Sequence, residues 1–355
     1  MRFPASPRTL IVSLSYPAHD GDPSGHFVRH QALELARCGE DVHVVAPRPS
    51  PGDAALYRST PIAGDALFAW PGAIARARDN PLRLLALAPM SIALRRATTG
   101  ERIDRVHLHW LVPTAWPLAP RFEGAHVEAI AHGADVRMLL AIPREVRERV
   151  LLALLGRTTR VRFVADALRE RLARALGPRA RAALEARSYV EPMGIDIADV
   201  QAPRDAPPSY VVWVGRDIPS KRLDLAIDAC SRANRWLVVV GATRAPRADV
   251  TFVGTVPRAE ALGWIAGADL LLSTSSEEGA PTAIREARAQ GVRVVACPAG
   301  DITRWANEDP GILIAEEEPA RISAMLERSG RVGVTRGAPV ARANWVPSPA
   351  HDSLS

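Results

Sequence analysis

Residues 211–221 read VVWVGRDIPSK, a run in which an apolar strand pattern leads directly into a charged loop. The strand pattern ends at Gly215, and Arg216 and Lys221 then lie in the loop before an amphipathic helical pattern. Ligands of open α/β sheets bind beyond the carboxyl ends of the strands. Two cations at that position predict a phosphate or diphosphate site, because arginine offers a planar fork and lysine a compact charge. The alternative is a solvated loop, but Lys221 is the only lysine among 45 Lys and Arg residues, which favours a site.

The strand–loop–helix pattern of this run repeats along the chain. We predict strands at residues 10–15, 42–46, 106–109, 127–131, 161–165, 210–214, 237–240, 250–253, 270–273, 292–296 and 312–314, with helices at 27–37, 222–233, 258–265 and 281–290 among the segments between them. Continuous apolar strands spaced by helices indicate parallel sheets that are covered on both faces. The fold class is therefore α/β.

The alternation lapses once, in the middle of the chain. Residues 201–209 (QAPRDAPPS) contain three prolines and no Val, Leu or Ile, so we predict a linker there. This division gives two doubly wound, Rossmann-like domains, the first over residues 1–200 and the second over residues 201–340. Residues 341–355 are predicted to form a C-terminal tail.

The overall composition is that of a soluble globular protein. The 355 residues are 47% hydrophobic and 24% charged, with a net charge of +6, which argues against intrinsic disorder. The three cysteines, Cys38, Cys230 and Cys297, are widely separated and form no CxxC pair. We therefore expect neither a disulfide framework nor a zinc site, and we predict a cytoplasmic location. No apolar run is long enough for a signal peptide or a membrane span.

Positive charge is concentrated between Arg137 and Arg187. This segment holds 13 Arg and 5 acidic residues. One interpretation is a basic face that makes peripheral contact with an anionic membrane at its inner surface. Solvated arginine-rich helices are the alternative, and we give the two equal weight. No aromatic side chains interleave the basic residues in the manner that stacks bases, so we do not expect a nucleic-acid partner.

A second polar turn follows the strand predicted at residues 270–273. Residues 271–291 read LLSTSSEEGAPTAIREARAQG, in which Pro281 is well placed at the start of a helix. The backbone N–H groups near Ala280, Thr282 and Ala283 would then face an anion. Glu278 and Glu286 lie before and inside that helix, and they could contact the sugar and the ribose of a bound ligand. Two such glutamates are also common as surface charges.

Taken together, these segments resemble the nucleotide-binding domain of the family 4 retaining glycosyltransferases. The pieces appear in the family's order, at Gly215, Arg216, Lys221, residues 252–256 (FVGTV), Ala268-Asp269, Glu278-Gly279, Glu286-Ala287, Gly291 and residues 294–296 (VVA). The pair Glu278 and Glu286 matches the family's E-x7-E signature. Many members have Phe-Gly after Glu-Gly, whereas this chain has Ala280-Pro281. That variant resembles the bacterial cell-surface polysaccharide enzymes of the teichuronic-acid type.

The resemblance covers about residues 8–315 and implies a specific architecture and site. It implies the GT-B fold, in which the two Rossmann-like domains face each other across a cleft, the first on the acceptor side and the second binding the nucleotide sugar. The implied contacts to the donor come from Arg216, Lys221, Val253, Glu278, Gly279, Ala280, Pro281, Thr282 and Glu286. The resemblance assigns catalytic roles to Glu278, Arg216 and Lys221, together with His132 of the first domain.

The first domain supplies further candidate residues. Ser24 and Gly25 lie in a loop of small residues before a helix, which suits a phosphate or an acceptor. His132 directly follows a strand and resembles the family's interdomain histidine, which implies a contact with the hydroxyls of the donor sugar. A loop histidine with a purely structural role is the alternative. His107 and His109 share one face of a strand, but without a third ligand at useful spacing we expect no metal site.

The sequence thus predicts an enzyme, a retaining hexosyltransferase that moves a sugar from a nucleotide-diphosphate sugar to an acceptor hydroxyl. Polysaccharide, glycolipid or glycoconjugate synthesis is the expected setting. We expect no cofactor, and by family frequency the donor is a UDP-sugar. A nucleotide-sugar epimerase or hydrolase on the same fold is one alternative. A non-catalytic basic module that binds membrane surfaces is the other.

Overall fold

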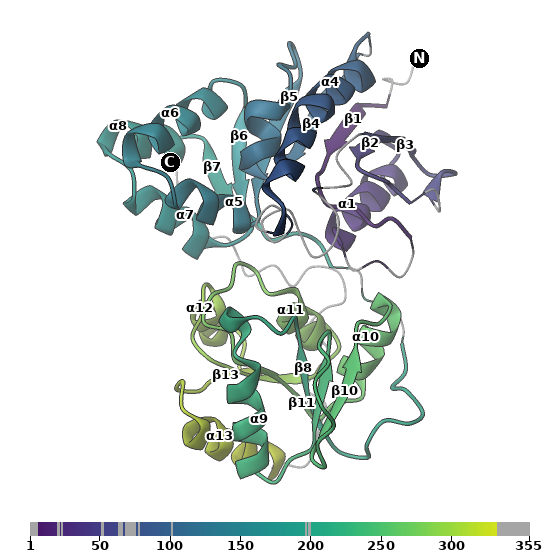
Figure 1. Ribbon diagram of the computed structural model, residues 1–355, viewed down its shortest axis with the longest axis vertical. Helices are drawn as coiled ribbons and strands as arrows, with labels where there is room; N and C mark the ends of the chain where they lie inside the picture. The colour runs from purple at the N-terminus through teal and green to yellow at the C-terminus, as the bar shows by residue number, and fades with distance from the viewer. Residues whose placement is uncertain are drawn as a thin grey trace. The chain divides into compact units, whose positions relative to one another are not determined.

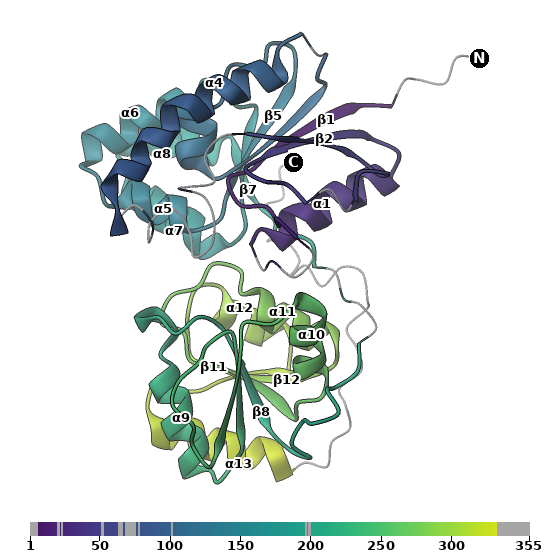
Figure 2. The same ribbon diagram turned by 45° about the vertical axis from the view of Figure 1, so that its right-hand side comes forward.

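The computed structural model describes residues 6–19, 22, 24–50, 53–62, 67, 76, 79–100, 102–195, 197 and 200–331. The chain divides into two compact units, Met1–Gly194 and Ile195–Ser355. Figures 1 and 2 show that each unit is a sheet covered by helices. The sequence places the boundary after residue 200. The predicted tail, residues 341–355, lies outside the described residues.

The first unit is built on a seven-stranded parallel sheet. Its strands are β1 (Arg8–Val12), β2 (Asp41–Ala46), β3 (Arg58–Pro61), β4 (Arg105–His109), β5 (His126–Ala131), β6 (Arg160–Phe163) and β7 (Ser188–Val190), in the order β3-β2-β1-β4-β5-β6-β7. The helical segments are α1 (His26–Arg37), η2 (Pro81–Ala86), α4 (Leu87–Thr98), η3 (Leu111–Leu118), α5 (Ala134–Leu140), α6 (Arg144–Leu155), α7 (Asp166–Arg174) and α8 (Pro178–Glu185). Every strand pair is parallel.

The second unit repeats this plan with six parallel strands. They are β8 (Val211–Val214), β9 (Leu237–Val240), β10 (Val250–Gly254), β11 (Leu270–Ser273), β12 (Arg293–Ala296) and β13 (Ile312–Ile314), in the order β10-β9-β8-β11-β12-β13. The helical segments are η4 (Pro219–Lys221), α9 (Leu223–Arg232), α10 (Arg258–Ala266), α11 (Thr282–Ala289), α12 (Ile302–Glu308) and α13 (Pro319–Arg331). Both units are thus doubly wound Rossmann-like domains, which confirms the predicted fold class.

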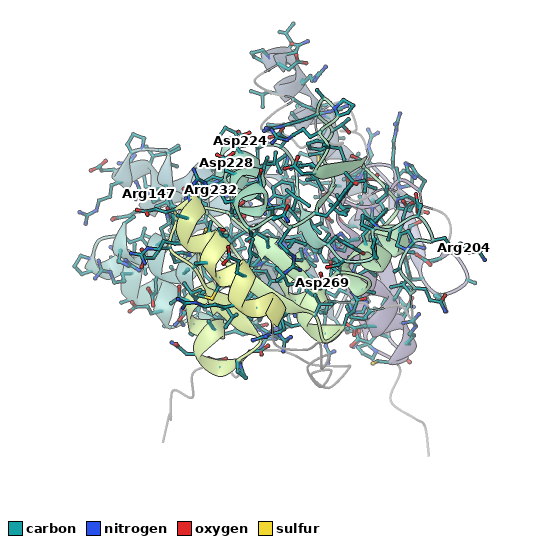
Figure 3. All side chains as sticks on the ribbon, turned by 90° about the horizontal axis from the view of Figure 1, so that it is seen from below. Arg147, Arg204, Asp224, Asp228, Arg232 and Asp269 are labelled. Carbon is teal, nitrogen blue, oxygen red and sulfur yellow. The ribbon has the colours of Figure 1, made fainter. Side chains whose placement is uncertain are left out.

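Alternate residues of the second sheet feed two separate cores. Val211 and Trp213 point to the face covered by α9 and α13, while Val212 points to the face covered by α10, α11 and α12. This alternation follows from the two-residue period of a strand. On the side opposite its buried face, α9 exposes Asp224, Asp228 and Arg232, which lie four residues apart (Figure 3).

The strand order fixes the edge at which a ligand can bind. In each sheet the order reverses beside the first strand of the domain, between β1 and β4 in one and between β8 and β11 in the other. Open α/β sheets bind ligands at the carboxyl ends of the strands flanking such a switch point. The loops after β8 and β11 hold the cationic and acidic residues singled out from the sequence.

Two features of the fold differ from the sequence prediction. The edge strand β3 was not predicted, because its residues are polar and none of them is fully buried, whereas β7 agrees with the strand and turn expected at residues 189–196. Residues 201–203, which were predicted to be part of the linker, instead pack on α10 and on Gly267, its C-cap residue. A Cβ atom at Gly263 would lie 2.6 Å from the carbonyl oxygen of Gln201, and one at Gly267 would lie 2.4 Å from Cβ of Ala202. The small residues of α10 thus hold this segment in the second domain.

Among the described residues, no helix is both long enough and apolar enough to cross a bilayer.

Candidate active site

The loops after β8 and β11 are joined by a dense set of hydrogen bonds. The Thr274 hydroxyl accepts a hydrogen bond from the Trp213 indole (3.1 Å) and lies 2.9 Å from the carbonyl oxygen of Lys221. The Arg222 guanidinium donates to the carbonyl oxygens of Thr274 (2.5 Å) and Ser275 (3.1 Å). These bonds cross the switch point of the sheet, so the position of Lys221 is fixed by β11 as well as by its own loop.

Lys221 and Glu278 meet directly at this switch point. The Lys221 ammonium lies 2.5 Å from Oε1 of Glu278, and the two side chains are 26% and 11% exposed. A partly buried ion pair of this kind is stronger than one on the open surface, because water screens it less. The residues predicted to contact the diphosphate and the sugar therefore form one cluster.

Helix α11 begins beside this pair. Pro281 is its N-cap residue, and its first turn, which begins at Thr282, contains no acidic side chain. The free N–H groups and the helix dipole therefore favour an anion from elsewhere at this end. Gly279 and Ala280, both partly buried, connect Glu278 to the helix.

Glu286 lies inside α11 and has a cationic partner that the sequence did not identify. Its Oε1 atom is 2.5 Å from the guanidinium of Arg258, the first residue of α10, and its side chain is only 8% exposed. Glu286, the residue predicted to contact the ribose, is thus held by an arginine side chain. Arg258 had no distinguishing signal in a chain so rich in arginine.

A third loop, after β12, closes against the residues around Glu278. Gly300 has φ of +55°, and a Cβ atom there would lie 2.4 Å from the carbonyl oxygen of Glu278. Only glycine permits both the left-handed backbone and the close approach. The turn that carries Glu278, after β11, is therefore in contact with the loops after β8 and β12.

Arg216 and Val253 complete the predicted set in the second domain. Arg216 is exposed on the loop after β8, and Val253 is partly buried near the end of β10. Gly215 donates to the carbonyl of Val240, and Gly241 donates to that of Gly254, so these loops lie along the same edge of the sheet. Their contacts with a donor remain predictions.

In the first domain, the loop after β1 folds tightly back on its own first residues. Gly25 has φ of +61°, and a Cβ atom there would lie 2.1 Å from the carbonyl oxygen of Ser15. Ser24 donates its backbone N–H to Asp22 (2.8 Å). The Phe27 ring, at the start of α1, lies 4.9 Å from the His132 ring. The predicted acceptor loop and the predicted sugar-binding histidine are therefore neighbours.

His132 follows β5 in a turn organised by a buried carboxylate. Asp135 accepts hydrogen bonds from the backbone N–H groups of Leu111, His132 and Gly133 at 2.8, 3.1 and 2.9 Å. Burial nevertheless raises the pKa of Asp135. Burial, together with the positive charge of Arg162, lowers the pKa of His132 to about 3. The imidazole of His132 is therefore neutral at physiological pH.

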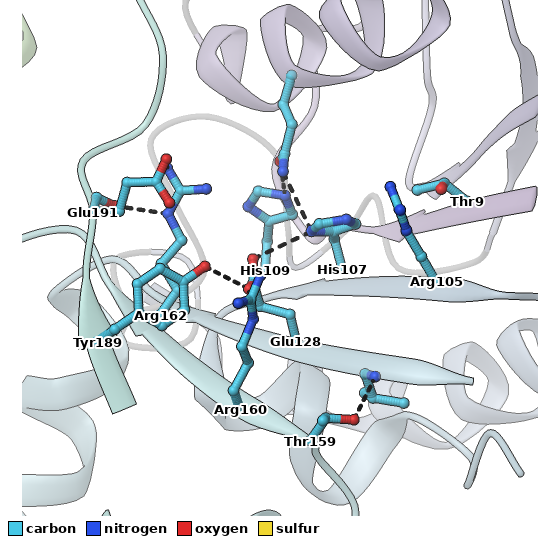
Figure 4. A network of polar contacts seen from close by, with 12 residues as sticks. Thr9, Arg105, His107, His109, Glu128, Thr159, Arg160, Arg162, Tyr189 and Glu191 are labelled. Carbon is cyan, nitrogen blue, oxygen red and sulfur yellow. Dashed lines mark hydrogen bonds and ion pairs between the residues drawn. The ribbon is translucent and has the colours of Figure 1, made fainter. Parts of the chain in front are cut away.

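His107 and His109 also take part in this part of the first domain, as hydrogen-bonding residues. His109 lies 2.9 Å from His132 and 3.0 Å from Gln31, and His107 lies 3.4 Å from Glu128 (Figure 4). Within the described ranges, no group of three or more His, Cys, Asp or Glu side chains could hold a metal ion. Gln31 was not singled out, because a lone glutamine on a helix carries no signal of its own.

The second domain matches a known family of domains. Residues 208–329 match the family model described as Glycosyl transferases group 1. Among curated proteins, none matches the chain significantly.

Similarity to solved structures extends over both domains. Sucrose-phosphate synthase (tll1590) from Thermosynechococcus elongatus is 18% identical with a TM-score of 0.67, over 91% of this chain and 89% of that one. Anabaena Alr3699/HepE, solved in complex with UDP and glucose, is 17% identical with a TM-score of 0.56, over 94% and 92%. WaaG, a glycosyltransferase involved in lipopolysaccharide biosynthesis, is 16% identical with a TM-score of 0.60, over 90% of each chain.

At these identities, the structural similarity defines the fold, which is GT-B, with two Rossmann-like domains. The family match adds that residues 208–329 are similar to glycosyl transferases group 1, which supports glycosyl transfer as the activity.

Proposed function

We propose that the protein is a retaining glycosyltransferase that moves a hexose from a nucleotide-diphosphate sugar to an acceptor hydroxyl. The observation that carries the proposal is the contact between Lys221 and Glu278 at the switch point, beside the N-terminus of α11. It lies within the segment that matches the glycosyltransferase family model. A cation, a carboxylate and a helix N-terminus are thus available within one short stretch of the sheet edge.

These groups suit the charges that develop during sugar transfer. When the bond between sugar and diphosphate breaks, negative charge grows on the departing phosphate. Lys221, Arg216 and the backbone N–H groups of Thr282 and Ala283 would stabilise that charge, and such interactions supply much of the rate enhancement in enzymes. The sugar meanwhile becomes positively charged, and the Glu278 carboxylate would stabilise it.

Retention follows from the family resemblance of the E-x7-E pair. In that resemblance the acceptor attacks from the face that the diphosphate leaves, and the departing phosphate takes the acceptor's proton. Because the leaving group acts as the base, no separate basic side chain is required. Glu286 would hold the ribose, and His132 would contact hydroxyls of the donor sugar.

We propose a UDP-hexose as donor, supported by the similarity to the HepE structure that contains UDP and glucose. A carbohydrate or lipid-linked hydroxyl is the proposed acceptor, in synthesis of a cell-surface polysaccharide, glycolipid or glycoconjugate. We propose that the side-chain cations stabilise the departing diphosphate and that no cofactor is needed. Chelation of divalent metals should then leave the rate unchanged, and loss of activity with EDTA would overturn this part of the proposal.

The proposed location is the cytoplasm, consistent with three cysteines that are all free thiols. A peripheral contact with anionic membrane through the segment from Arg137 to Arg187 is part of the proposal. It predicts binding to anionic vesicles that weakens as salt is raised.

The decisive experiment uses purified protein and a panel of nucleotide sugars. The donor that raises the melting temperature most is then incubated with and without acceptor sugars. A glycosyltransferase releases nucleoside diphosphate and forms a glycoside with retained anomeric configuration only when acceptor is present. Conversion of the donor without acceptor would indicate an epimerase or hydrolase, and no binding of any nucleotide sugar would contradict the proposal.

A further inference from the structure

Arg222 begins helix α9 in a backbone conformation that arginine rarely adopts. Its φ and ψ angles are +50° and +52°, in the left-handed region, and it is the N-cap residue of the helix. This region is strained for a residue with a Cβ atom, whereas glycine adopts it freely. Such strain persists where the surrounding contacts enforce it, and it is concentrated at functional sites. The contacts of the Arg222 side chain show what enforces this turn.

The guanidinium of Arg222 uses two of its edges to join its own loop to two others. One edge, Nε and Nη2, donates to the carbonyl oxygens of Thr274 (2.5 Å) and Ser275 (3.1 Å) in the loop after β11. The other edge, Nη1 and Nη2, donates to the carboxylate of Glu317 (2.6 and 3.1 Å) in the loop after β13. Lysine could not reproduce this planar arrangement, because its ammonium is a compact charge without a fork.

Glu317 holds the guanidinium in this orientation. It lies between β13 and α13, and α13 packs beside α9 on one face of the second sheet (Figures 1 and 2). The hydrogen bonds between the two side chains raise the pKa of Arg222 and lower that of Glu317. Both groups are therefore charged at neutral pH. The hydrogen bonds from Arg222 to the two carbonyls are thus charge-assisted, and such bonds are about twice as strong as neutral ones.

These contacts connect the two segments that carry Lys221 and Glu278. Arg222 directly follows Lys221, and the carbonyls that accept from it lie four and three residues before Glu278. The Lys221 ammonium lies 2.5 Å from Oε1 of Glu278. This contact requires that the two loops keep a fixed separation, and the side chain of Arg222 fixes it from the position next to the lysine.

Weaker bonds between the same loops do not involve this side chain. The Thr274 hydroxyl donates to the carbonyl oxygen of Lys221 or of Arg222, which lie at 2.9 and 3.0 Å. The backbone N–H of Ser276 donates to the carbonyl oxygen of Ser220 (2.8 Å). These bonds are neutral, so loss of the guanidinium should loosen the connection between the loops without abolishing it. A variant that lacks the side chain is therefore expected to fold.

We propose that Arg222 is a positioning residue, whose guanidinium is oriented by Glu317 and holds the ammonium of Lys221 at the carboxylate of Glu278. Its effect on sugar transfer rests on the proposed glycosyltransferase function. Its effect on the lysine does not, because the protein's own contacts produce it. Arg222 thereby acts on the departing diphosphate through Lys221 without contacting it.

The composition of the chain allows Lys221 to be observed directly. It is the only lysine in the sequence, so ligand-free protein grown with ¹³C,¹⁵N-labelled lysine gives one lysine side-chain signal by NMR. Glu278→Gln removes the carboxylate charge, and the signal of this variant marks an unpaired ammonium. Arg222→Gly removes the guanidinium but favours the left-handed turn. We expect it to move the signal most of the way to the position seen in Glu278→Gln.

Three further variants separate positioning from other effects. Arg222→Asn also tolerates the left-handed turn but lacks the added flexibility of glycine, and it should move the signal as far as Arg222→Gly. Glu317→Ala should move it in the same direction by a smaller amount. Arg321→Ala, on α13 with its side chain 65% exposed, is the control and should match the wild type.

Kinetics with the identified donor provide the second measurement. A misplacement of about 1 Å can lower a rate about 10²-fold, so Arg222→Gly should lower kcat about 10- to 100-fold, with a smaller change in the KM of the donor. Arg222→Lys should lose nearly as much, because it keeps the charge but not the fork. A merely structural arginine would instead lower stability and leave both the lysine signal and the kcat of the folded protein unchanged.

Two results would overturn the proposal. One is a lysine signal that does not change in Glu278→Gln, which would mean that the ion pair is not formed in solution. The other is an unchanged signal in Arg222→Gly. If that variant does not fold, Glu317→Ala decides in the same way, and an unchanged signal there would overturn the proposal. If no nucleotide sugar is turned over, the glycosyltransferase function fails, but the lysine signal still decides the role of Arg222.

Discussion

The two domains share one sheet plan but place opposite kinds of chemistry at its carboxyl edge. In the second domain the edge carries two charged pairs, Lys221 with Glu278 and Arg258 with Glu286. In the first domain it carries neutral imidazoles joined by hydrogen bonds, with His132 at the end of the line. The same fold thus supports an ionic site in one half and an uncharged site in the other.

This difference would suit the charges of the proposed nucleotide-sugar donor. The diphosphate is an anion whose charge grows as the sugar departs, and fixed cations stabilise it. Sugar hydroxyls are neutral, and a neutral hydrogen-bond acceptor recognises them without the cost of burying a charge. We infer that each domain has the electrostatics of the part of the donor assigned to it.

Several arginines of the first domain have a structural role. In the first domain, Arg147 donates to the carbonyl oxygens of Leu139, Ile142 and Ala175, and Arg181 and Arg187 also bind backbone carbonyls. These carbonyls lie at or near the C-terminal ends of helices, where unsatisfied acceptors gather. Arg258 of the second domain instead pairs with the predicted ligand-binding carboxylate of Glu286, although Arg222 in that domain also binds backbone carbonyls.

The largest expected effect comes from removing the ammonium group of Lys221. Lys221→Ala should lower kcat about 10²- to 10³-fold, the usual range when one donor to a developing negative charge is lost. The overall fold should remain, because the other loop bonds of Thr274 and Arg222 do not depend on the lysine side chain. Turnover and far-ultraviolet circular dichroism measure the two effects.

Arg247→Ala is the matched control for Lys221→Ala. Arg247 is an exposed cation just before β10, at the amino end of the strands, and its removal should leave kcat unchanged. If Lys221→Ala transferred sugar at the wild-type rate, the ionic assignment of the second domain would be wrong.

A smaller effect, on stability alone, is expected from the buried Arg147. Hydrogen bonds to charged groups contribute about 1.5–3 kcal/mol, so Arg147→Ala should lower the free energy of unfolding by about 2–3 kcal/mol. Urea denaturation measures this loss. Arg179→Ala, on the exposed side of α8, should change stability by less than about 0.5 kcal/mol. An equally stable Arg147→Ala protein would mean that this arginine is not a structural cap.

The fold could be predicted from the sequence because most of its inner strands are largely apolar, above all β8, β9 and β11 of the second sheet. Such strands are buried on both faces, and their pattern does not depend on distant residues. The edge strand β3 depends on pairing with a neighbour, since its own residues are polar and only partly buried or exposed. Residues 201–203 looked like a linker because their composition does not reveal the glycines of α10 on which they pack.

The site could be predicted only in part, for a related reason. Strand-end position and the family-like order singled out Lys221, Glu278 and Glu286. Their pairing depends on which loops the sheet brings together, and Arg258 and Gln31 differ in no local way from other residues of their type. From the cluster of positive charge between Arg137 and Arg187, it likewise could not be predicted that several of these side chains bind backbone carbonyls.

The second ionic pair should affect donor binding more than the chemical step. Glu286→Gln removes the charge that holds Arg258 and the proposed acceptor for the ribose hydroxyls. A lost charged hydrogen bond of about 1.5 kcal/mol should raise the KM of the donor about tenfold, with little change in kcat. Steady-state kinetics and calorimetric titration with UDP measure this.

Arg258→Ala tests whether the pair acts as a unit. If Arg258 mainly orients Glu286, the double variant should bind no more weakly than Glu286→Gln alone, because coupled residues are not additive. Additive losses would show that the two side chains act independently and that the pair is incidental.

The smallest effect is expected from the neutral half, as a change in how stability depends on pH. The folded-state pKa of His132 is about 3, whereas an unfolded histidine titrates near 6.5. As the pH falls below 6.5, only the unfolded chain takes up this proton, so stability declines until about pH 3 and is unaffected well above 6.5. Between pH 7.5 and pH 5.5, uptake of this proton should lower the free energy of unfolding by about 1.4 kcal/mol.

The variant His132→Gln should remove this part of the pH dependence when urea denaturation is compared at the two pH values. The control is His126→Gln, at the exposed start of β5, the strand before His132, and it should keep the wild-type pH dependence. An unchanged pH dependence in His132→Gln would show that the folded protein protonates this imidazole as readily as the unfolded chain does, and the contrast between the two domains would then fail.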